Sequence, residues 1–311
     1  MKAVLPALAR PLIEAGLPSE IEPHWFASRE EAAALVADAD IAWVDMMRPE
    51  WAGEAAAAGP RSKWLSTIYA GIDAFDVALL KQRGSVLTNG VGINAIAVAE
   101  FAVMGVLAAA KRFDQVVRMA DRREWPADAP GKVELFETRA LIVGYGTIGR
   151  MIGDRLAAFG VMVTGVTRSG RDGTLTPDQW RDRIGEYDWI ILAAPSTGDT
   201  HALIGTAELT AMKPGAWLIN IARGDMVDQV SLIEALEKRR IAGAFLDVVD
   251  PEPLPADHPL WTTPNVIHSM HLSGRSQTKM FMRAAALFLE NARAFVEGRP
   301  MQNVVDLDAG Y

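Results

Sequence analysis

The sequence contains no cysteine, which excludes disulfide bonds, thiolate metal ligands and cysteine nucleophiles. It has no run of basic residues and its formal net charge is −8, so we do not expect nucleic acid as a partner. Charged residues make up 23% of the 311 residues and hydrophobic residues 50%, which is typical of a globular protein. A chain of this length can form two domains.

Long apolar runs are also lacking. The most apolar segment, residues 94–110, is interrupted by Glu100 and is too short to span a bilayer, so we expect no membrane as a partner. We interpret it as a helix buried between domains or subunits. Near the N-terminus, Arg10 and Pro11 occur before any long apolar run forms, unlike in a signal peptide, and we expect a cytoplasmic protein.

What the chain does contain is a β-branched run that leads into a glycine-rich turn. Residues 139–149 read Arg-Ala-Leu-Ile-Val-Gly-Tyr-Gly-Thr-Ile-Gly, a strand pattern followed by G-x-G-x-x-G. In dinucleotide-binding units these glycines permit a tight turn, close approach of a pyrophosphate, and close packing of the next helix. The alternative is a structural turn without a ligand. We predict that the residues of this turn bind the cofactor, namely Gly144, Tyr145, Gly146, Thr147, Ile148 and Gly149.

The end of the next predicted strand, residues 161–166, indicates which dinucleotide binds. NAD-binding units usually carry Asp or Glu about 20 residues beyond the glycine motif, where the carboxylate accepts hydrogen bonds from the ribose. This chain has Thr167, Arg168 and Ser169 there. A guanidinium can pair with a 2′-phosphate and hydroxyl groups can donate to it. We therefore predict NADP(H) as the preferred cofactor, with NAD(H) possible; the alternative is a solvated arginine in a surface loop.

Strand patterns alternate with helical patterns along the chain, which predicts parallel sheets covered by helices. Before the glycine motif we expect strands at 2–5, 41–44, 64–68 and 85–87, and helices at 7–16, 29–37, 74–83 and 94–112. A polar linker is expected at 121–132. From the motif onward we expect strands at 139–143, 161–166, 188–193, 216–221, 241–247 and 265–267. The helices expected between and after them are 148–159, 178–184, 206–212, 228–239 and 276–296.

Three charged residues follow predicted strand ends, where ligands bind to parallel sheets: Arg223, Glu252 and His271. Each alone could be structural: an arginine closing a strand, a solvated glutamate or a satisfied core histidine. Together they suit hydride transfer to a 2-oxo acid. A guanidinium can hold the carboxylate and polarise the carbonyl, and a histidine can donate the proton. A glutamate bonded to a histidine fixes its tautomer and favours its charged form.

Four motifs occur in a fixed order: Gly144-x-Gly-x-x-Gly149, Asn-Ile-Ala-Arg-Gly-Asp at 220–225, the segment 246–255, and Pro-Leu-Trp-x-x-Pro-Asn-Val at 259–266. The segment 246–255 reads Leu-Asp-Val-Val-Asp-Pro-Glu-Pro-Leu-Pro. In these motifs the chain resembles the D-isomer-specific 2-hydroxyacid dehydrogenases. In character it is most similar to the glyoxylate/hydroxypyruvate reductases that prefer NADPH. The resemblance runs from about Ser66 to the C-terminus.

This resemblance implies an α/β protein with two doubly wound domains, a Rossmann NAD(P)-binding domain inserted in a flavodoxin-like substrate domain. We expect the substrate domain to comprise residues 1–93 and 275–311. The dinucleotide-binding domain, with the interdomain helix, would comprise residues 94–274. The family also implies a homodimer that reduces a 2-oxo acid to the D-2-hydroxy acid, or catalyses the reverse.

Residue roles follow from the resemblance at matching positions. Arg223 would bind and polarise the substrate, His271 would be the acid/base, and Glu252 would be its partner. The substrate carboxylate would bind to the backbone of a loop in the first domain, residues Ala70, Gly71 and Ile72.

The resemblance also implies further cofactor contacts. Asp247 would meet the nicotinamide carboxamide, while Pro195 and Ala222 would line the cofactor. Two positions depart from the family pattern. Thr167 replaces the acid usual in NAD-using members, which agrees with the cofactor prediction, and Met270 replaces the proline that usually precedes the histidine.

The identity of the substrate stays open. Met46, Met47 and Trp51 follow the strand expected at 41–44 and could line the substrate pocket, where they would favour bulkier 2-oxo acids. Ordinary packing, or a place in a surface loop, is the alternative for all three.

Two other functions stay open as well. A nucleotide-sensing regulatory or corepressor module would keep the fold but need not keep the charged trio. A metal hydrolase could use His258, His268 and His271 as ligands, but the motifs already assign His271. We expect a small 2-oxo or 2-hydroxy acid as the partner and no metal.

Overall fold

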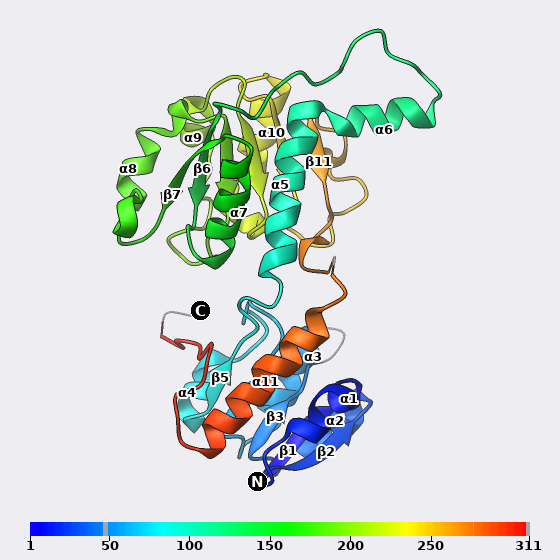
Figure 1. Cartoon of the computed structure of the whole chain (residues 1–311), viewed down its shortest axis with the longest axis vertical. Helices are drawn as coiled ribbons and strands as arrows, with labels where there is room; N and C mark the ends of the chain where they lie inside the picture. Colours follow the sequence, from blue (N-terminus) through cyan, green and yellow to red (C-terminus); the bar gives the residue numbers. More distant parts are fainter. Residues whose placement is uncertain (46–48, 276, 309–311) are drawn as a thin grey trace. The chain divides into compact units, whose positions relative to one another are not determined.

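A computed structural model of the protein describes residues 1–45, 49–275 and 277–308. The chain forms two compact units, one of Met1–Asn94 with Gln277–Tyr311 and one of Ala95–Ser276. Each unit contains one parallel β-sheet with helices on both faces (Figure 1). The prediction of two parallel α/β units is therefore confirmed. We call them the first unit and the second unit.

The first unit has a five-stranded sheet in the order β2-β1-β3-β4-β5, the strand order of flavodoxin-like folds. Its strands are β1 (Lys2–Pro6), β2 (Glu22–Phe26), β3 (Ile41–Trp43), β4 (Trp64–Ser66) and β5 (Val86–Thr88). Helices α2 (Arg29–Val36), α3 (Pro49–Ala57) and α4 (Val77–Arg83) pack on one face. Helices α1 (Arg10–Ile13) and α11 (Met280–Val296) pack on the other.

Four elements of the first unit differ from the sequence prediction. The helix expected at 7–16 is divided into the 3₁₀ turn Ala7–Ala9, α1, and the 3₁₀ turn Glu14–Gly16. Strand β2 was not predicted, because Pro23 and the polar residues around it hide the alternation of a strand. Helix α3 was not predicted either. Helix α11 begins at Met280, and the expected start at Ser276 lies outside the described residues.

The second unit has a six-stranded sheet in the order β11-β10-β9-β8-β6-β7. Its strands are β6 (Arg139–Val143), β7 (Met162–Val166), β8 (Trp189–Leu192), β9 (Trp217–Asn220), β10 (Gly243–Leu246) and β11 (Val266–His268). This is a Rossmann arrangement in which the strand beyond β7 is reduced to one bridge between Val166 and Leu175. The strand order reverses at β6, which has β7 on one side and β8 on the other.

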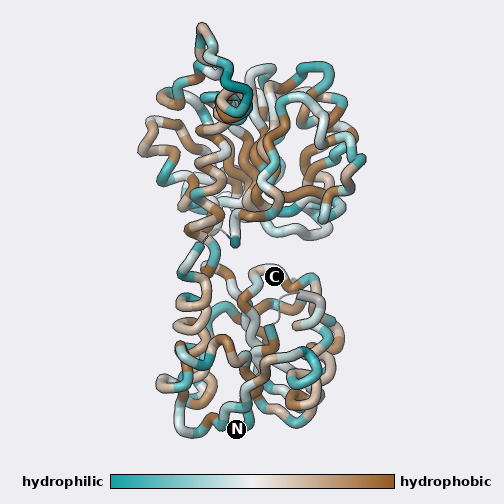
Figure 2. Tube along the Cα trace, turned by 90° about the vertical axis from the view of Figure 1, so that its right-hand side faces the viewer, coloured by the Kyte–Doolittle hydropathy of each residue, from teal (hydrophilic) through white to brown (hydrophobic). Residues whose placement is uncertain are grey.

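Two hydrophobic layers enclose this sheet. Helices α5 (Ala95–Lys111) and α7 (Thr147–Ala158) cover one face. Helices α8 (Pro177–Arg181), α9 (Thr206–Ala211) and α10 (Gln229–Glu237) cover the other. The strands between them are strongly hydrophobic (Figure 2). Helix α5 approaches the sheet closely, since a Cβ on Gly105 would lie 2.7 Å from the Phe245 ring.

Helix α6 (Phe113–Asp121) follows α5 and was not predicted from the sequence. Arg112 has a φ of 49°, a left-handed conformation that separates the two helices. No residue of α6 is buried, and Phe113, Val116 and Val117 are exposed on it. Within residues 1–45, 49–275 and 277–308, none of the helices combines the length and apolarity that a membrane crossing needs.

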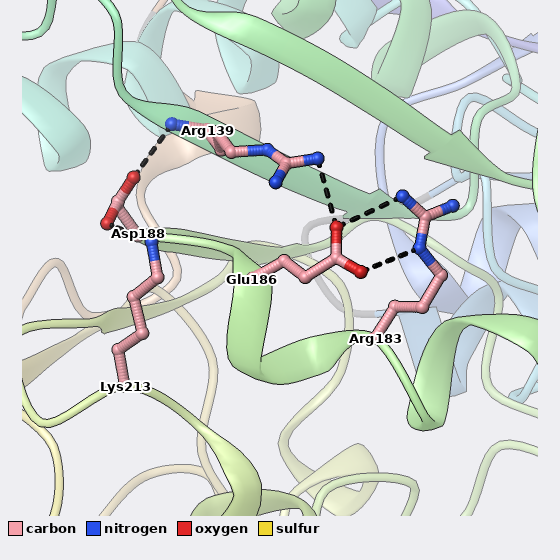
Figure 3. Close-up of polar contacts among 5 residues, drawn as sticks. All are labelled: Arg139, Arg183, Glu186, Asp188 and Lys213. Atoms are coloured by element: carbon pink, nitrogen blue, oxygen red, sulfur yellow. Dashed lines mark hydrogen bonds and ion pairs between the residues drawn. The ribbon is translucent and has the colours of Figure 1, made fainter.

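Charged side chains gather at the amino edge of the second sheet (Figure 3). Asp188 accepts hydrogen bonds from the Arg139 backbone N–H at 2.8 Å and from Lys213 Nζ at 2.8 Å. Glu186 pairs with Arg139 at 3.0 Å and with Arg183 at 3.0 Å. The hydrogen bonds from Arg183 hold the pKa of Glu186 below its usual value. This edge carries a network of ion pairs, while the glycine turn and the charged trio lie at the opposite, carboxyl edge.

Candidate active site

The glycine-rich turn between β6 and α7 is built by close backbone contacts. Gly144 has a φ of 97°, and a Cβ there would lie 2.3 Å from the Ala194 nitrogen. A Cβ on Gly149 would lie 2.2 Å from the Gly144 oxygen. Both positions therefore require glycine, for the turn and for the packing of α7 on β6.

Gly146 differs from the other two glycines because its Cβ position is empty. It is the N-cap of α7, and no atom lies within 4 Å of the place where a Cβ would be. The first N–H groups of a helix have no intrahelical partner and point out of its N-terminus. The open space therefore fits an anionic phosphate group, which these N–H groups and the helix dipole would stabilise. Thr147 and Ile148 are the first two helical residues there.

Tyr145 serves mainly in packing. Its N–H donates to the Val166 carbonyl at 2.8 Å. Its ring fills the space left by two glycines, since a Cβ would lie 2.6 Å from Tyr145 Oη at Gly153 and 2.3 Å from Tyr145 Cγ at Gly165. The Arg150 guanidinium lies 5.3 Å from the ring centroid. The side chain thus joins α7 to β7.

The loop after β7 carries Thr167, Arg168 and Ser169. Thr167 is held by a hydrogen bond of 2.7 Å between its hydroxyl and that of Thr174. Arg168 and Ser169 are exposed, and Ser169 accepts a hydrogen bond from Arg171 Nε at 3.0 Å. The loop therefore presents hydroxyl and guanidinium groups at the carboxyl end of β7.

One acidic residue of this loop is already paired with a base. Asp172, which is exposed, lies 3.1 Å from Arg150 Nη2 on α7. No acidic side chain occurs at 167–169, where an NAD-binding unit would hold the ribose hydroxyls.

Asn220, at the end of β9, fixes the segment that carries Arg223. Its Oδ1 accepts from the Ala222 N–H at 3.0 Å and its Nδ2 donates to the Arg223 carbonyl at 2.8 Å. A Cβ on Gly224 would lie 2.0 Å from the carbonyl carbon of Val249, so this segment packs directly on the backbone after β10. The sequence analysis missed the role of Asn220, although it is the first residue of a motif quoted there.

Pro195 follows β8 at the same edge. Its carbonyl accepts from Thr200 Oγ1 at 2.8 Å, and the next residue, Ser196, donates to Asp225 Oδ2 at 2.6 Å. These bonds join the loops after β8 and β9. Pro195 and Ala222 are therefore held at neighbouring strand ends beside the glycine turn.

Asp247 holds the segment that follows β11. It is 2% exposed, and its Oδ1 accepts from Ser269 Oγ at 2.6 Å, from the Leu272 N–H at 3.1 Å and from the Ser273 N–H at 3.3 Å. Its Oδ2 is buried and has no hydrogen-bond partner among the described residues. A buried acceptor without a donor is costly. The amide group of a nicotinamide carboxamide would supply such a donor, so this residue fits the expected cofactor.

His271 and Glu252 form a hydrogen-bonded pair. His271 Nδ1 lies 2.5 Å from Glu252 Oε2, and the side chains are 45% and 34% exposed, so a small molecule can reach them. The Val249 N–H donates to Glu252 Oε1 at 3.1 Å. Because Nδ1 faces the carboxylate, Nε2 is directed away from it and is the nitrogen that can exchange a proton with a substrate.

The electrostatics of Glu252 also involve Arg223. Partial burial acts to raise the pKa of Glu252, but three groups act against it: the hydrogen bond and charge of His271, the Val249 N–H and the charge of Arg223. The pKa of Glu252 therefore lies below its ordinary value, and the carboxylate stays ionised. The structure thus brings together the trio that the sequence analysis selected, at the carboxyl ends of β9, β10 and β11.

The backbone at the histidine is unusual. Met270 and His271 have φ values of 53° and 54°, a left-handed conformation that costs on the order of 1 kcal/mol per residue. The His271 N–H donates to the Asp247 carbonyl at 2.5 Å, which helps to hold it. Proline cannot adopt a positive φ. The methionine at 270 is therefore compatible with this backbone, whereas the proline usual in the family is not.

The three histidines considered as metal ligands have other contacts. His258 Nδ1 accepts from the Leu260 N–H at 3.2 Å, and His268 Nε2 lies 3.1 Å from the Leu260 carbonyl oxygen. Across the described part of the chain, no group of three His, Cys, Asp or Glu side chains is placed to hold a metal ion.

In the first unit, the loop predicted to bind the substrate carboxylate follows β4. Its carbonyls are used internally, since the Gly90 N–H donates to Tyr69 O at 2.8 Å and Asn89 Nδ2 donates to Ala70 O at 2.9 Å. None of the hydrogen bonds found in the described residues uses the N–H groups of Ala70, Gly71 and Ile72. These N–H groups could therefore donate hydrogen bonds to an anion such as a carboxylate.

Of the three residues suggested for the substrate pocket, only Trp51 lies within the described residues. Met46 and Met47 lie outside the described residues. Trp51 lies in α3, where the Arg29 guanidinium is 5.4 Å from its ring.

The fold and the carboxyl edge of the second sheet define a dinucleotide-dependent oxidoreductase. Residues 103–273 match the family described as "D-isomer specific 2-hydroxyacid dehydrogenase, NAD binding domain". The chain belongs to this family, whose members are NAD(P)-dependent enzymes.

Individual relatives agree with this assignment. The chain is 33% identical over 258 residues to a glyoxylate/hydroxypyruvate reductase B of Pectobacterium atrosepticum. The aligned residues cover 79% of this chain and 80% of the relative. A family protein from Aeromonas salmonicida has a solved structure with a TM-score of 0.86, 28% identity and 99% coverage of both chains. An NADPH-dependent glyoxylate/hydroxypyruvate reductase from Sinorhizobium meliloti, solved with NADP and malonate, has a TM-score of 0.78, 26% identity, and coverage of 99% and 97%.

The empty Cβ position of Gly146 gives a direct test of the cofactor site. Because no atom lies within 4 Å, Gly146→Ala should leave folding unchanged, but its methyl group would occupy the space for the phosphates. We expect the Kd for NADPH, measured by fluorescence titration, to rise by about 10-fold or more. Gly215→Ala is the matched control, since its Cβ would also meet nothing within 4 Å and it lies outside the glycine turn. Equal affinities in the two variants would contradict the assigned site.

Proposed function

We propose that the protein reduces a small 2-oxo acid to the D-2-hydroxy acid, or catalyses the reverse reaction, with NADP(H). The observation that carries this proposal is the hydrogen-bonded pair of His271 and Glu252, with the charge of Arg223 acting on Glu252, at the carboxyl edge of the sheet that holds the glycine turn. The D configuration and the reaction class follow from the family.

Each residue has a separate task in this reaction. Arg223 binds the substrate carboxylate and polarises the carbonyl that is reduced. His271 gives a proton from Nε2 to the carbonyl oxygen, while Glu252 at 2.5 Å from Nδ1 stabilises the charged ring and fixes its tautomer. NADPH supplies the hydride when bound. The N–H groups of Ala70–Ile72 take the carboxylate.

Asp247 orients the nicotinamide. Its Oδ2, which has no hydrogen-bond partner among the described residues, would accept from the carboxamide, and its Oδ1 keeps the segment of His271 in place through the Leu272 and Ser273 N–H groups. Asp247 would thus hold the cofactor and the acid/base, His271, in fixed positions next to each other.

The preference for NADPH over NADH is the second part of the proposal. Thr167, Arg168 and Ser169 offer hydroxyl and guanidinium groups to a 2′-phosphate, and none of them repels it. The Sinorhizobium meliloti relative is described as NADPH-dependent, which agrees with this preference.

Glyoxylate and hydroxypyruvate are the first substrates to test, because the Pectobacterium relative is named for them. A sensor or corepressor on the same fold is the alternative function. It is less favoured because a sensor does not need the hydrogen bond between His271 and Glu252. The cytoplasmic location stays a prediction from the sequence.

We expect Arg168→Ala to raise the KM for NADPH by about 10-fold, because it removes the charge that pairs with the 2′-phosphate. The KM for NADH should change little. Initial rates with both cofactors at saturating 2-oxo acid measure this. Arg183→Ala, at the amino edge of the same sheet, is the control and should alter neither constant. Equal KM values for NADPH and NADH in the wild-type enzyme would refute the preference.

Replacing the acid/base should separate catalysis from cofactor binding. His271→Ala should lower kcat by about 10²–10⁴-fold and leave the Kd for NADPH unchanged, since general acid catalysis contributes about that much.

Arg223→Ala should raise the substrate KM and lower kcat together, because the guanidinium acts in the ground state and in the transition state. Loss of NADPH absorbance with a panel of 2-oxo acids measures both variants. No turnover by the wild-type protein on any acid, with NADPH still bound, would favour the sensor.

A homodimer is the third part of the proposal, and an exposed apolar surface on the second unit supports it. A groove of about 590 Å³ on the second unit is lined by side chains of α5, α6 and α7, among them Val103, Met104, Leu107, Phe113 and Phe159. Phe113 is 57% exposed, and Val116 and Val117 continue the apolar surface along α6. An exposed apolar surface of this kind marks a protein interface, and a second copy of the chain would cover it.

The dimer can be tested by introducing charged side chains into the groove. Met104→Glu combined with Phe113→Asp places two carboxylates in the groove, which would have to be desolvated on association. We expect sedimentation velocity to give a dimer for the wild-type protein and a monomer for the double variant. Val230→Glu, at an exposed position on α10, is the control and should remain a dimer. A monomeric wild-type protein would contradict the proposal.

A further inference from the structure

Asp45, just after β3 in the first unit, accepts three hydrogen bonds that the reaction does not explain. Its Oδ1 accepts from Thr67 Oγ1 at 2.7 Å. Its Oδ2 accepts from Trp43 Nε1 at 2.5 Å and from the Ile68 N–H at 2.6 Å. All three donors are neutral, and two of them belong to the residues directly after β4. The carboxylate therefore joins the ends of two neighbouring strands at the carboxyl edge of the sheet.

The hydrogen bonds of Asp45 continue into the substrate loop, residues 69–72. Thr67 Oγ1, which donates to Asp45, also accepts from the Tyr69 N–H at 3.2 Å. Thr67 is 3% exposed, so its hydroxyl has little access to water. The side chain of Asp45 thus sets the position of Thr67, Ile68 and Tyr69, the three residues that enter the loop.

The far side of the loop is fixed independently. Asn89 and Gly90 hold the carbonyls of Ala70 and Tyr69, and Asn303 holds Asn89 in turn. Asn303 Nδ2 donates to the Asn89 carbonyl at 3.2 Å, and the Asn89 N–H donates to the Asn303 carbonyl at 3.0 Å. With its carbonyls held on this side, the direction of the loop N–H groups depends on where Asp45 holds the loop entry.

Asp45 is itself held by a rigid neighbour. Trp43, one of its donors, stacks on Phe288 of α11 at a centroid distance of 4.9 Å. Trp64 stacks on the same ring at 5.0 Å. The indole N–H that meets Asp45 therefore belongs to a packed aromatic cluster and moves little.

The charge of Asp45 is unfavourable for folding. Removal of water around the half-buried carboxyl raises its pKa to about 6, and the hydrogen bonds from Thr67, Ile68 and Trp43 offset this only in part. At neutral pH the carboxyl group of Asp45 is ionised although its burial disfavours the charged form, and this lowers the free energy of unfolding. An amide or apolar side chain would avoid this loss, so stability alone does not account for the aspartate.

We propose that Asp45 is the positioning residue of the substrate loop, and that its carboxylate orients the N–H groups of Ala70, Gly71 and Ile72 toward the carboxylate of the 2-oxo acid. Asp45 does not touch the substrate and acts through Thr67 and Ile68. The inference rests on the proposed function, in which this loop binds the substrate carboxylate.

Asp45→Ala removes the acceptor of all three hydrogen bonds. Since a shift of about 1 Å in a binding group can cost up to about 100-fold in rate, we expect the KM for the 2-oxo acid to rise by about 10-fold or more. The KM for NADPH should stay within about 2-fold, because the glycine turn belongs to the other unit. Asp45→Asn keeps an oxygen for the two N–H donors and should restore most of the substrate KM. The Asn variant should also unfold at the same or a higher temperature at pH 8, because it carries no buried charge.

Two further variants complete the experiment. Thr67→Val keeps the shape of the side chain but removes the hydroxyl that links Asp45 to Tyr69, so it should raise the substrate KM even if Asp45→Ala fails to fold. Ser85→Ala is the matched control, because Ser85 is 5% exposed and its hydroxyl bonds to Ser62 O at 2.7 Å at the amino edge of the same sheet. It should lower stability without changing KM.

The outcomes separate this inference from the proposed function. If the wild-type protein reduces no 2-oxo acid, the proposed function fails and the inference fails with it. If the wild-type protein is active and Thr67→Val and every folded Asp45 variant keep the wild-type substrate KM, the inference alone is overturned. The inference would also be overturned if Asp45→Ala and Thr67→Val raised the substrate KM by no more than Ser85→Ala does. The rise in all three variants would then reflect loss of stability.

Discussion

Asp247 joins the end of β10 to the segment that carries His271, and the candidate active site depends on this one carboxylate. Three donors from residues 269–273 meet Oδ1, and the His271 N–H meets the Asp247 carbonyl. These bonds offset the left-handed conformation of Met270 and His271. Oδ2 of the same carboxylate has no hydrogen-bond partner among the described residues, so it can accept a hydrogen bond from a ligand. One side chain therefore sets both the position of the histidine and the place where a donor group of the ligand would bind.

The two units use their sheets in the same way. In each, buried parallel strands give a rigid layer, and the residues that could bind a ligand follow the carboxyl ends of neighbouring strands. Backbone contacts too close for any side chain position the glycine turn in the second unit. Side-chain hydrogen bonds from Asp45 and Asn89 position the loop in the first. The amino edge of the second sheet, by contrast, carries ion pairs and serves stability.

Two departures from the family pattern have physical reasons in this chain. Met270 occupies a backbone conformation closed to proline, so the histidine segment follows a path of its own. Thr167 is held by Thr174, and positions 167–169 of the loop that would meet the ribose carry no acid. The first departure concerns the shape of the acid/base segment and the second concerns the charge of the cofactor loop. The two can therefore be tested separately.

The sequence by itself determined the elements whose signal is local. The β-branched runs and the G-x-G-x-x-G turn predicted the strands and the first turn of the second unit, and motif order predicted the family. The roles of Arg223, Glu252 and His271 stay predictions, although the structure brings them together. Strand β2 was missed because Pro23 and the polar residues around it hide its alternation, whereas helix α6 was missed although Phe113, Val116 and Val117 have helical spacing. Only the tertiary structure revealed the hydrogen bonds from Thr67 and Ile68 to Asp45, because a bond between segments distant in sequence leaves no local pattern.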